Sequence, residues 1–215
     1  MEIIVPITAY TASLAAHQMG FGLGQFIMPL GWPVELVVWI SALTFMIYIV
    51  HFALHRVRSL WAFHRIHHCD ENLEATSALR HHPVEDFIAL VTGIALAFLL
   101  TPSLNTLVFA FAIIMLINLF NHSRIELPDR VSTLLEWIVV TPRLHRVHHS
   151  PLARQTDSNF GGTFTIWDRL FGTFCLERAA GMGLDHESLA GPNSRDFDTL
   201  MLEPFKFLFK GRQQD

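Results

Sequence analysis

The chain has 215 residues, of which 51% are hydrophobic and only 16% are charged, and it contains 13 histidines. Its net charge of -4 and the scatter of its basic residues among acids exclude a basic stripe for nucleic acid. Cys69 and Cys175 stand alone, so neither a disulfide framework nor a thiolate zinc site is indicated. The composition favours a membrane protein, and we expect residues 1–215 to form a single domain.

The first thirty residues are apolar, rich in glycine and interrupted by Pro6 and Pro29. They are expected to cross the bilayer; re-entry into it and a place in its interface are the alternatives. No Lys or Arg precedes Arg56, so the N-terminus lacks the positive region of a signal peptide.

Three uncharged or nearly uncharged stretches follow, at residues 34–54, 87–100 and 104–120. The first is the clearest transmembrane helix, since 21 residues at 1.5 Å each span roughly 30 Å. The other two are separated by Thr101, Pro102 and Ser103, which predicts a helical hairpin. The sequence therefore predicts an all-α membrane bundle of about four transmembrane helices; a soluble bundle with buried helices is the alternative.

Basic residues are absent between His81 and Ser123. By the positive-inside rule, residues 56–85 and everything after residue 122 face the cytoplasm. The tail, about residues 192–215, mixes apolar residues with charges. It is expected to be amphipathic and to lie on the membrane surface or dock on the domain, and an ordinary packed helix is equally open.

Eight of the thirteen histidines fall in three clusters. His51 and His55 form HxxxH, while two HxxHH motifs contain the residues His64, His67, His68, His145, His148 and His149. Residues at i, i+3 and i+4 share one face of a helix, so each cluster is expected to present several imidazoles together. Eight nitrogens are too many for one tetrahedral ion and suit two metals.

Other metal chemistries are disfavoured by missing motifs. A zinc protease needs HExxH and a soluble ferritin-like di-iron site needs Glu-x-x-His, and the sequence contains neither. The clusters are predicted to lie at one depth near the cytoplasmic boundary, with His122 where the hairpin returns.

The sequence resembles the fatty acid hydroxylase and sterol desaturase superfamily of integral-membrane di-iron oxygenases. The matching motifs lie between about residues 40 and 175. They are HxxxH from His51, LWxxHxxHH from Leu60, RHHPVE from Arg80, NHS from Asn121, TPRLHRVHHS from Thr141, NFGG from Asn159 and WDRLFGT from Trp167.

This resemblance implies transmembrane helices with a cytoplasmic, histidine-rich metal-binding cap. Two iron ions there would activate O2 to hydroxylate or desaturate a lipid-like substrate from the bilayer, such as a sterol or fatty acyl chain. Electrons would come from NAD(P)H through a separate carrier of the cytochrome b5 or ferredoxin type. The implied metal ligands are His51, His55, His64, His67, His68, His145, His148 and His149, with His122 and His82 as additions.

Other residues are expected to support the site or lie outside it. Metal-bound imidazoles usually donate their second N–H to a carboxylate or carbonyl, and the candidate carboxylates are Glu85, Asp86, Asp157 and Asp168. For Asp168, an ion pair with Arg169 is an equally open alternative to a contact with a metal-bound imidazole. His81 is a weaker candidate for a metal ligand than His82. His17 and His186 each stand alone and are not expected to bind metal.

Two rival functions stay open. One is a catalytically silent membrane protein that keeps the metal for structure, and the other is a metal or haem transport or electron-transfer protein.

Overall fold

A computed structural model describes residues 4–70, 72–184 and 196–210, and within these ranges the chain is helical, with no strand. One isolated bridge pairs Val139 with Phe164. The predicted all-α class is confirmed.

The helices of the N-terminal half are α1 (Ile4–Gln18), α2 (Gly24–Ile27), η1 (Met28–Leu30), α3 (Trp32–Arg56), α4 (Arg58–His64), η2 (His67–Cys69), η3 (Ala75–Leu79) and α5 (Pro83–Leu100). Those that follow are α6 (Leu104–Asn121), α7 (Asp129–Leu135), α8 (Pro142–His148), α9 (Ala153–Thr156), α10 (Ile166–Phe171) and α11 (Phe197–Lys210).

The chain divides into two compact units, each built from two stretches of sequence. We call residues 1–47 and 86–116 the apolar unit, and residues 48–85 and 117–215 the histidine unit. Helices α3, α5 and α6 each contribute to both. The expectation of a single domain stays a prediction.

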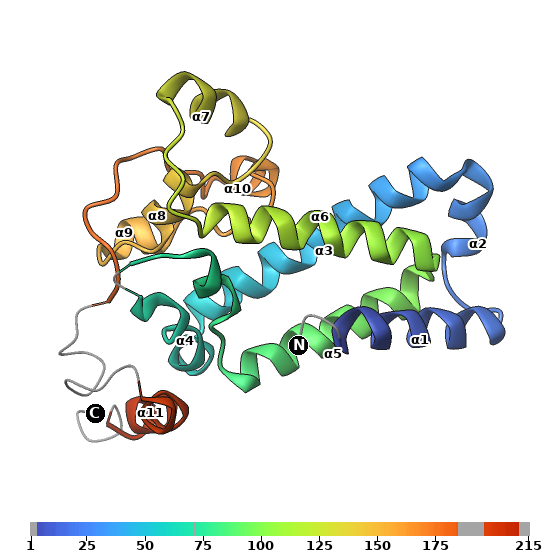
Figure 1. The fold of residues 1–215 in the computed structure, drawn as a ribbon. Coiled ribbons are helices and arrows are strands. Elements are labelled where there is room, and N and C mark those ends of the chain that lie inside the picture. Colours follow the sequence, from blue (N-terminus) through green and yellow to red (C-terminus); the bar gives the residue numbers. More distant parts are fainter. Residues whose placement is uncertain (1–3, 71, 185–195, 211–215) are drawn as a thin grey trace. The chain divides into compact units, whose positions relative to one another are not determined.

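The apolar unit has a core built from α1, α3, α5 and α6 (Figure 1). Its buried members are Ala9, Trp39, Leu43, Leu96, Ala97, Leu100, Leu107 and Ala110. The predicted hairpin is present, because α5 ends at Leu100 and α6 begins at Leu104. Glu35, the one acid of the first predicted span, accepts hydrogen bonds from the Ser103 backbone N–H at 2.5 Å and from the Ser103 hydroxyl at 3.1 Å. This buried carboxylate therefore caps the first turn of α6 from another helix.

Among the helices of the described residues, three are long and apolar enough to cross a membrane. They are α3 with 25 residues and α5 and α6 with 18 each. All three predicted spans are confirmed as helices. Helix α1 has 15 residues, which is about 22 Å and short of the roughly 30 Å hydrocarbon core. A fourth crossing by the first thirty residues, like the cytoplasmic side of the histidines, stays a prediction.

The histidine unit consists of short helices and connecting segments around the end of α3. Its C-terminal helix, α11, packs against α4: the Phe205 ring lies 5.8 Å from the Phe63 ring, and the Arg65 guanidinium lies 4.3 Å from the Phe207 ring. Three large apolar side chains of α11, Phe197, Leu202 and Phe209, are exposed. Residues Phe197–Lys210 of the predicted tail thus form a helix that packs on α4, and residues 192–195 and 211–215 of the tail lie outside the described residues.

Candidate metal centre

The clustered histidines come from four places in the histidine unit. His51 and His55 occupy the last turns of α3, and His122 directly follows α6. The second HxxHH motif lies on α8, which begins with Pro142 behind the N-cap Thr141. Thr141 accepts a hydrogen bond from the Leu144 N–H, which fixes the start of this short helix.

The first HxxHH motif differs from the expected single helix. Its first histidine ends α4, and the remaining two lie on the separate 3₁₀ turn η2, with a turn between them. All three rings are buried nonetheless. The spacing predicts the convergence of these rings but not the break in the backbone.

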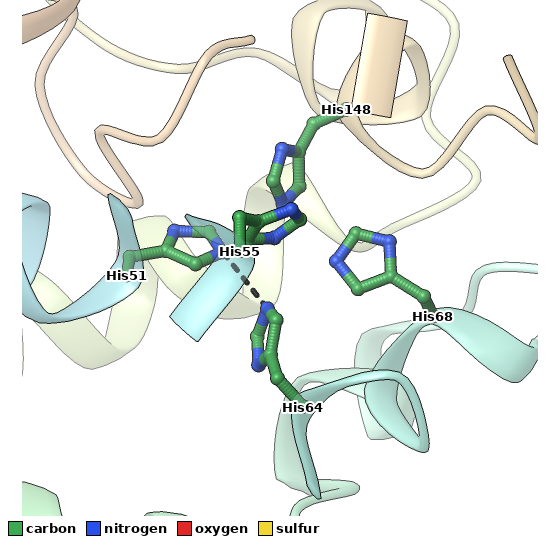
Figure 2. Close-up of side chains that lie close together, drawn as sticks. All are labelled: His51, His55, His64, His68 and His148. Carbon is green, nitrogen blue, oxygen red and sulfur yellow. Dashed lines mark hydrogen bonds between the residues drawn. The ribbon is translucent and has the colours of Figure 1, made fainter. Parts of the chain in front are cut away.

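The structure gathers nine histidines into two groups. The first group contains His51, His55, His64, His68 and His148, and Figure 2 shows their rings turned toward one another from α3, α4, η2 and α8. The second group contains His67, His122, His145 and His149. Within each group the candidate ligand nitrogens all lie within 4.8 Å of one another. Two nitrogens on opposite sides of one ion are about 4.2 Å apart, so both groups have the size of a metal site.

Each HxxHH motif divides its histidines between the two groups. The i and i+4 members lie in one group: His64 and His68 in the first, and His145 and His149 in the second. The remaining member of each motif lies in the other group, which places His67 in the second group and His148 in the first. The groups touch, because the His68 and His149 rings stack with centroids 4.3 Å apart. The two motifs therefore build two adjacent sites.

Backbone carbonyls determine which ring nitrogen carries the proton in the second group. His67 Nδ1 lies 3.2 Å from the Arg80 carbonyl oxygen, and His122 Nδ1 lies 2.8 Å from that of Asn118. A carbonyl oxygen only accepts, so both Nδ1 atoms donate and both Nε2 atoms of these neutral rings are unprotonated. These Nε2 atoms nevertheless face each other at 3.3 Å, and His122 Nε2 is also 2.9 Å from His145 Nε2. Two unprotonated nitrogens at this distance cannot form a hydrogen bond with each other. Such an arrangement is expected where both nitrogens bind the same cation.

The first group repeats this pattern. His51 Nδ1 donates to the Phe160 carbonyl at 2.8 Å, and His64 Nδ1 donates to Glu85 Oε1 at 3.0 Å. Their Nε2 atoms lie 3.0 Å apart, the contact marked in Figure 2. His148 Nδ1 donates to the Ser158 carbonyl at 2.7 Å, while its Nε2 is buried with no hydrogen-bond partner among the described residues. The donor set of both groups thus fits metal ions.

Two of the predicted carboxylates contact ligand candidates. Glu85 orients His64, and Asp157 Oδ1 lies 3.6 Å from His55 Nδ1 while also pairing with Arg56 at 3.1 Å. Asp86 belongs to the apolar unit. A carboxylate that accepts the Nδ1 proton, as Glu85 does, fixes the tautomer and ring orientation of a metal-bound histidine. The Asp157 contact is too long for this, and His55 Nδ1 has no hydrogen-bond partner among the described residues.

Asp168, for which a role beside a metal-bound imidazole and an ion pair with Arg169 were equal alternatives, accepts hydrogen bonds from backbone amides and a hydroxyl. Its two oxygens accept from the Phe160 N–H at 2.7 Å and the Gly161 N–H at 2.8 Å, and Oδ1 also accepts from the Thr173 hydroxyl. Arg169 donates to the Glu136 carbonyl. Because the Phe160 carbonyl orients His51, the buried Asp168 supports the site through this loop. Burial raises the pKa of Asp168, and the hydrogen bonds from Thr173 and the two amides oppose that rise.

Glycines at two positions shape the backbone around Asp168. Gly172 has φ +73° and ends α10 in the left-handed region. A Cβ on Gly161 would collide with the Phe164 carbonyl and with Asp168 Oδ2. The carbonyl contacts of residues 158 and 160 with the histidines have no signature in the sequence, although the NFGG motif contains Phe160 and directly follows Ser158.

Burial favours the neutral form of six of the clustered histidines. It lowers the pKa of His122 to about 4 and that of His148 to about 3. Burial, and then the nearness of other imidazoles, holds the pKa values of His67, His68, His145 and His149 well below their usual range. A metal ligand must be a neutral imidazole, so the environment supplies the form that binds.

His82 is the predicted ligand that the structure brings to neither group. Its Nδ1 accepts from the Val84 N–H at 3.1 Å, its Nε2 lies 3.4 Å from the Met201 carbonyl, and its ring packs between Phe63 and Phe205. Ligation by His82 stays a prediction, and this geometry leaves it no free lone pair. His81 lies near the His67 ring outside both groups, His17 is on α1, and His186 is outside the described residues.

Comparison with known proteins adds independent information. The family model for fatty acid hydroxylase matches residues 36–173. The chain is 35% identical over 165 residues to an alkylglycerol monooxygenase from Xenopus tropicalis, covering 74% of this chain and 35% of that protein. It is 32% identical over 145 residues to the ornithine lipid hydroxylase OlsE from Rhizobium tropici, covering 66% and 43%.

A human alkylglycerol monooxygenase is 32% identical over 154 residues, covering 69% of this chain and 33% of that protein. The matched segment thus spans between a third and a half of each of these relatives. No solved structure matches the chain.

Proposed function

Because the chain belongs to the fatty acid hydroxylase family, we propose that it is a membrane-bound di-iron oxidoreductase that uses O2 to hydroxylate a lipid-like substrate. One observation carries the two-metal part of this proposal. In both histidine groups, imidazoles whose Nδ1 atoms donate to acceptors face each other through their Nε2 atoms, at 3.0 Å between His51 and His64 and 3.3 Å between His67 and His122.

The ligands would divide as the groups do. One iron would be held by His51, His55, His64, His68 and His148, and the other by His67, His122, His145 and His149. Bound there, the irons would supply the redox chemistry with O2 that breaks an unactivated C–H bond. The protein's part is to aim Nε2 inward through Glu85 and the carbonyls of Arg80, Asn118, Ser158 and Phe160, and to exclude water by burial.

Hydroxylation is favoured over desaturation, since the relatives are named as monooxygenases and a hydroxylase. The balanced reaction joins one C–H bond, O2, two electrons and two protons to give an alcohol and water. The electrons would come from NAD(P)H through a separate protein of the cytochrome b5 or ferredoxin type, reaching the site from the cytoplasmic side.

For the substrate, we propose a polar lipid with a long alkyl or acyl chain that enters from the bilayer. The names of the relatives give an alkylglycerol and an ornithine lipid, which share a polar head and a long chain. The three apolar helices support a membrane location for the protein, and such a lipid resides in the membrane. A sterol is the less favoured member of the class.

The test compares the lipids of a host that expresses the wild type, His148→Ala or His17→Ala. His148 contributes to the first group, while His17 is an exposed histidine on α1. The wild type and His17→Ala should yield the same new hydroxylated lipid, and His148→Ala should yield none. Purified wild type that binds iron but neither consumes O2 nor forms product would support the silent metal protein, and a haem Soret band would support the transport or electron-transfer alternative.

A further inference from the structure

An apolar surface that the metal chemistry does not use lies on α7, the segment after it and α10. Its large side chains each expose half or more of their surface, up to 72% at Leu134; they are Leu134, Trp137, Ile138, Ile166, Leu170 and Phe171. We call these six residues the α7–α10 surface. A monomer in water rarely exposes so many large apolar side chains together, so something is expected to cover them.

The two parts of this surface are held together by backbone and side-chain contacts. The Thr165 N–H donates to the Ile138 carbonyl at 3.1 Å, and the neighbouring pair Val139 and Phe164 forms the isolated bridge. The Arg169 guanidinium lies 4.5 Å from the Trp137 ring and donates to the Glu136 carbonyl at 2.9 Å. The surface is therefore a fixed feature of the histidine unit.

Charge is arranged around this surface in a way that suits lipid. The acids next to its large apolar side chains, Glu136 and Asp168, are buried, and Glu136 is paired with Arg143. Asp129, at the other end of α7, is exposed and lies 3.5 Å from Arg143. Arg169 is exposed beside Trp137. Tryptophan and arginine together are typical of the membrane interface, where the ring lies at the headgroup level and the guanidinium reaches the phosphates.

The surface also continues onto a candidate membrane span. The Phe171 ring stacks on Tyr48 of α3 with centroids 5.3 Å apart, and Tyr48 stacks in turn on Phe52 of the same helix. Helix α3 is the longest apolar helix of the described residues. A surface in contact with such a helix lies next to lipid.

From this exposure, charge pattern and continuity, we propose that the α7–α10 surface lies in the bilayer, at the boundary between headgroups and acyl chains. Helices α7 and α10 then form an interfacial membrane contact in addition to the spans. This contact would hold the histidine unit against the lipid independently of any bound metal or catalytic activity.

Spin labels test this location in the full-length protein. A nitroxide is attached at Ile138→Cys or Leu170→Cys in a Cys175→Ser background, in which Cys69 is buried. The control label is at Arg154→Cys, an exposed charged position on α9. In vesicles of phosphatidylcholine and phosphatidylglycerol, power saturation compares collisions with lipid-soluble O2 and with a water-soluble nickel chelate. The labels at residues 138 and 170 should favour O2 several-fold more than the control.

Two results would overturn the proposal. One is a label at residue 138 or 170 that meets the nickel chelate as freely as the control does. The other is shielding from both agents with spin–spin broadening, which would show that a second copy covers the surface. A second measurement uses Trp137→Phe in vesicles with brominated acyl chains: the fluorescence difference between wild type and variant should be quenched by the bromines, and an unquenched difference would contradict lipid contact.

Discussion

The apolar unit and the histidine unit bury opposite kinds of side chains, although α3 contributes to both. In the apolar unit, α3 contributes Trp39 and Leu43 to a core of hydrocarbon side chains. Further along in the histidine unit, the same helix presents His51 and His55 to a cluster of imidazoles. Hydrophobic packing in the apolar core has no preferred direction, so one apolar side chain can replace another of similar size. A metal-binding imidazole, in contrast, is oriented by a hydrogen-bond acceptor at the ring nitrogen that does not bind the metal.

This contrast implies that the two units respond differently to mutation. Changes in the histidine unit should alter metal binding through ring orientation and protonation. Changes in the apolar unit should alter stability and leave the metal content unchanged.

The largest effect is expected from Glu85→Ala. This substitution removes the acceptor for His64 Nδ1, so the ring loses its fixed tautomer, and iron affinity should fall roughly 10- to 100-fold. Glu85→Gln should have a much smaller effect, because an amide oxygen still accepts the hydrogen bond. Iron retained during graded chelation measures this, with Glu177→Ala at a more exposed carboxylate as control. Equal iron retention in Glu85→Ala and the control would contradict a positioning role.

A pH dependence is expected for the iron-free protein. The pKa of His122 is about 4 and that of His148 about 3, both below the ordinary 6.5. Between pH 6.5 and these values the unfolded state binds more protons, so stability is fully present above pH 6.5 and is lost as the pH falls. Each such histidine contributes about 1.4 kcal/mol per pH unit in this window.

Thermal unfolding of the apoprotein in detergent at about pH 7 and about pH 5 measures this slope. His122→Asn should reduce it, because one titrating group is removed. The same unfolding temperature at both pH values in the wild type would show that the buried histidines are not held neutral.

A smaller effect on stability alone is expected from Glu35→Ala in the apolar unit. The substitution leaves the Ser103 N–H and hydroxyl without their buried acceptor, which should lower the free energy of unfolding by about 1–3 kcal/mol. Iron content per folded chain should equal that of the wild type. A parallel loss of iron would break the separation between the two units.

The smallest effect is expected from His82→Ala. Both nitrogens of His82 have protein partners outside the two groups, so iron content should match the wild type. Metal analysis alongside His148→Ala, which should lose iron, gives the comparison. Should His82→Ala lose as much iron as His148→Ala, the ligation predicted from the sequence would be supported and the set of nine ligands would be too small.

The sequence was sufficient for the features that depend on local composition. The spans at α3, α5 and α6 follow from uncharged stretches of sufficient length, and the turn at residues 101–103 follows from its proline. The closeness of the i and i+4 histidines within each motif follows from their spacing. These predictions succeed because hydropathy and helical periodicity are properties of neighbouring residues.

Features that depend on tertiary contacts were not predictable in this way. The break between α4 and η2 is compatible with the same i, i+3, i+4 spacing as a continuous helix. The division of each motif between two groups requires the folded positions of α3 and α8. Backbone carbonyls such as those of Ser158 and Phe160 have no residue identity to recognise, and Asp168 acts on backbone amides, so its role cannot be read from a histidine spacing.

The central claim is that two groups of histidines bind two adjacent ions. Iron analysis combined with Mössbauer spectroscopy of the purified, iron-reconstituted protein tests it most directly. We predict two iron ions per chain, bound mainly by nitrogen and magnetically coupled in the oxidised state. A single iron per chain, or two that show no coupling, would contradict the account.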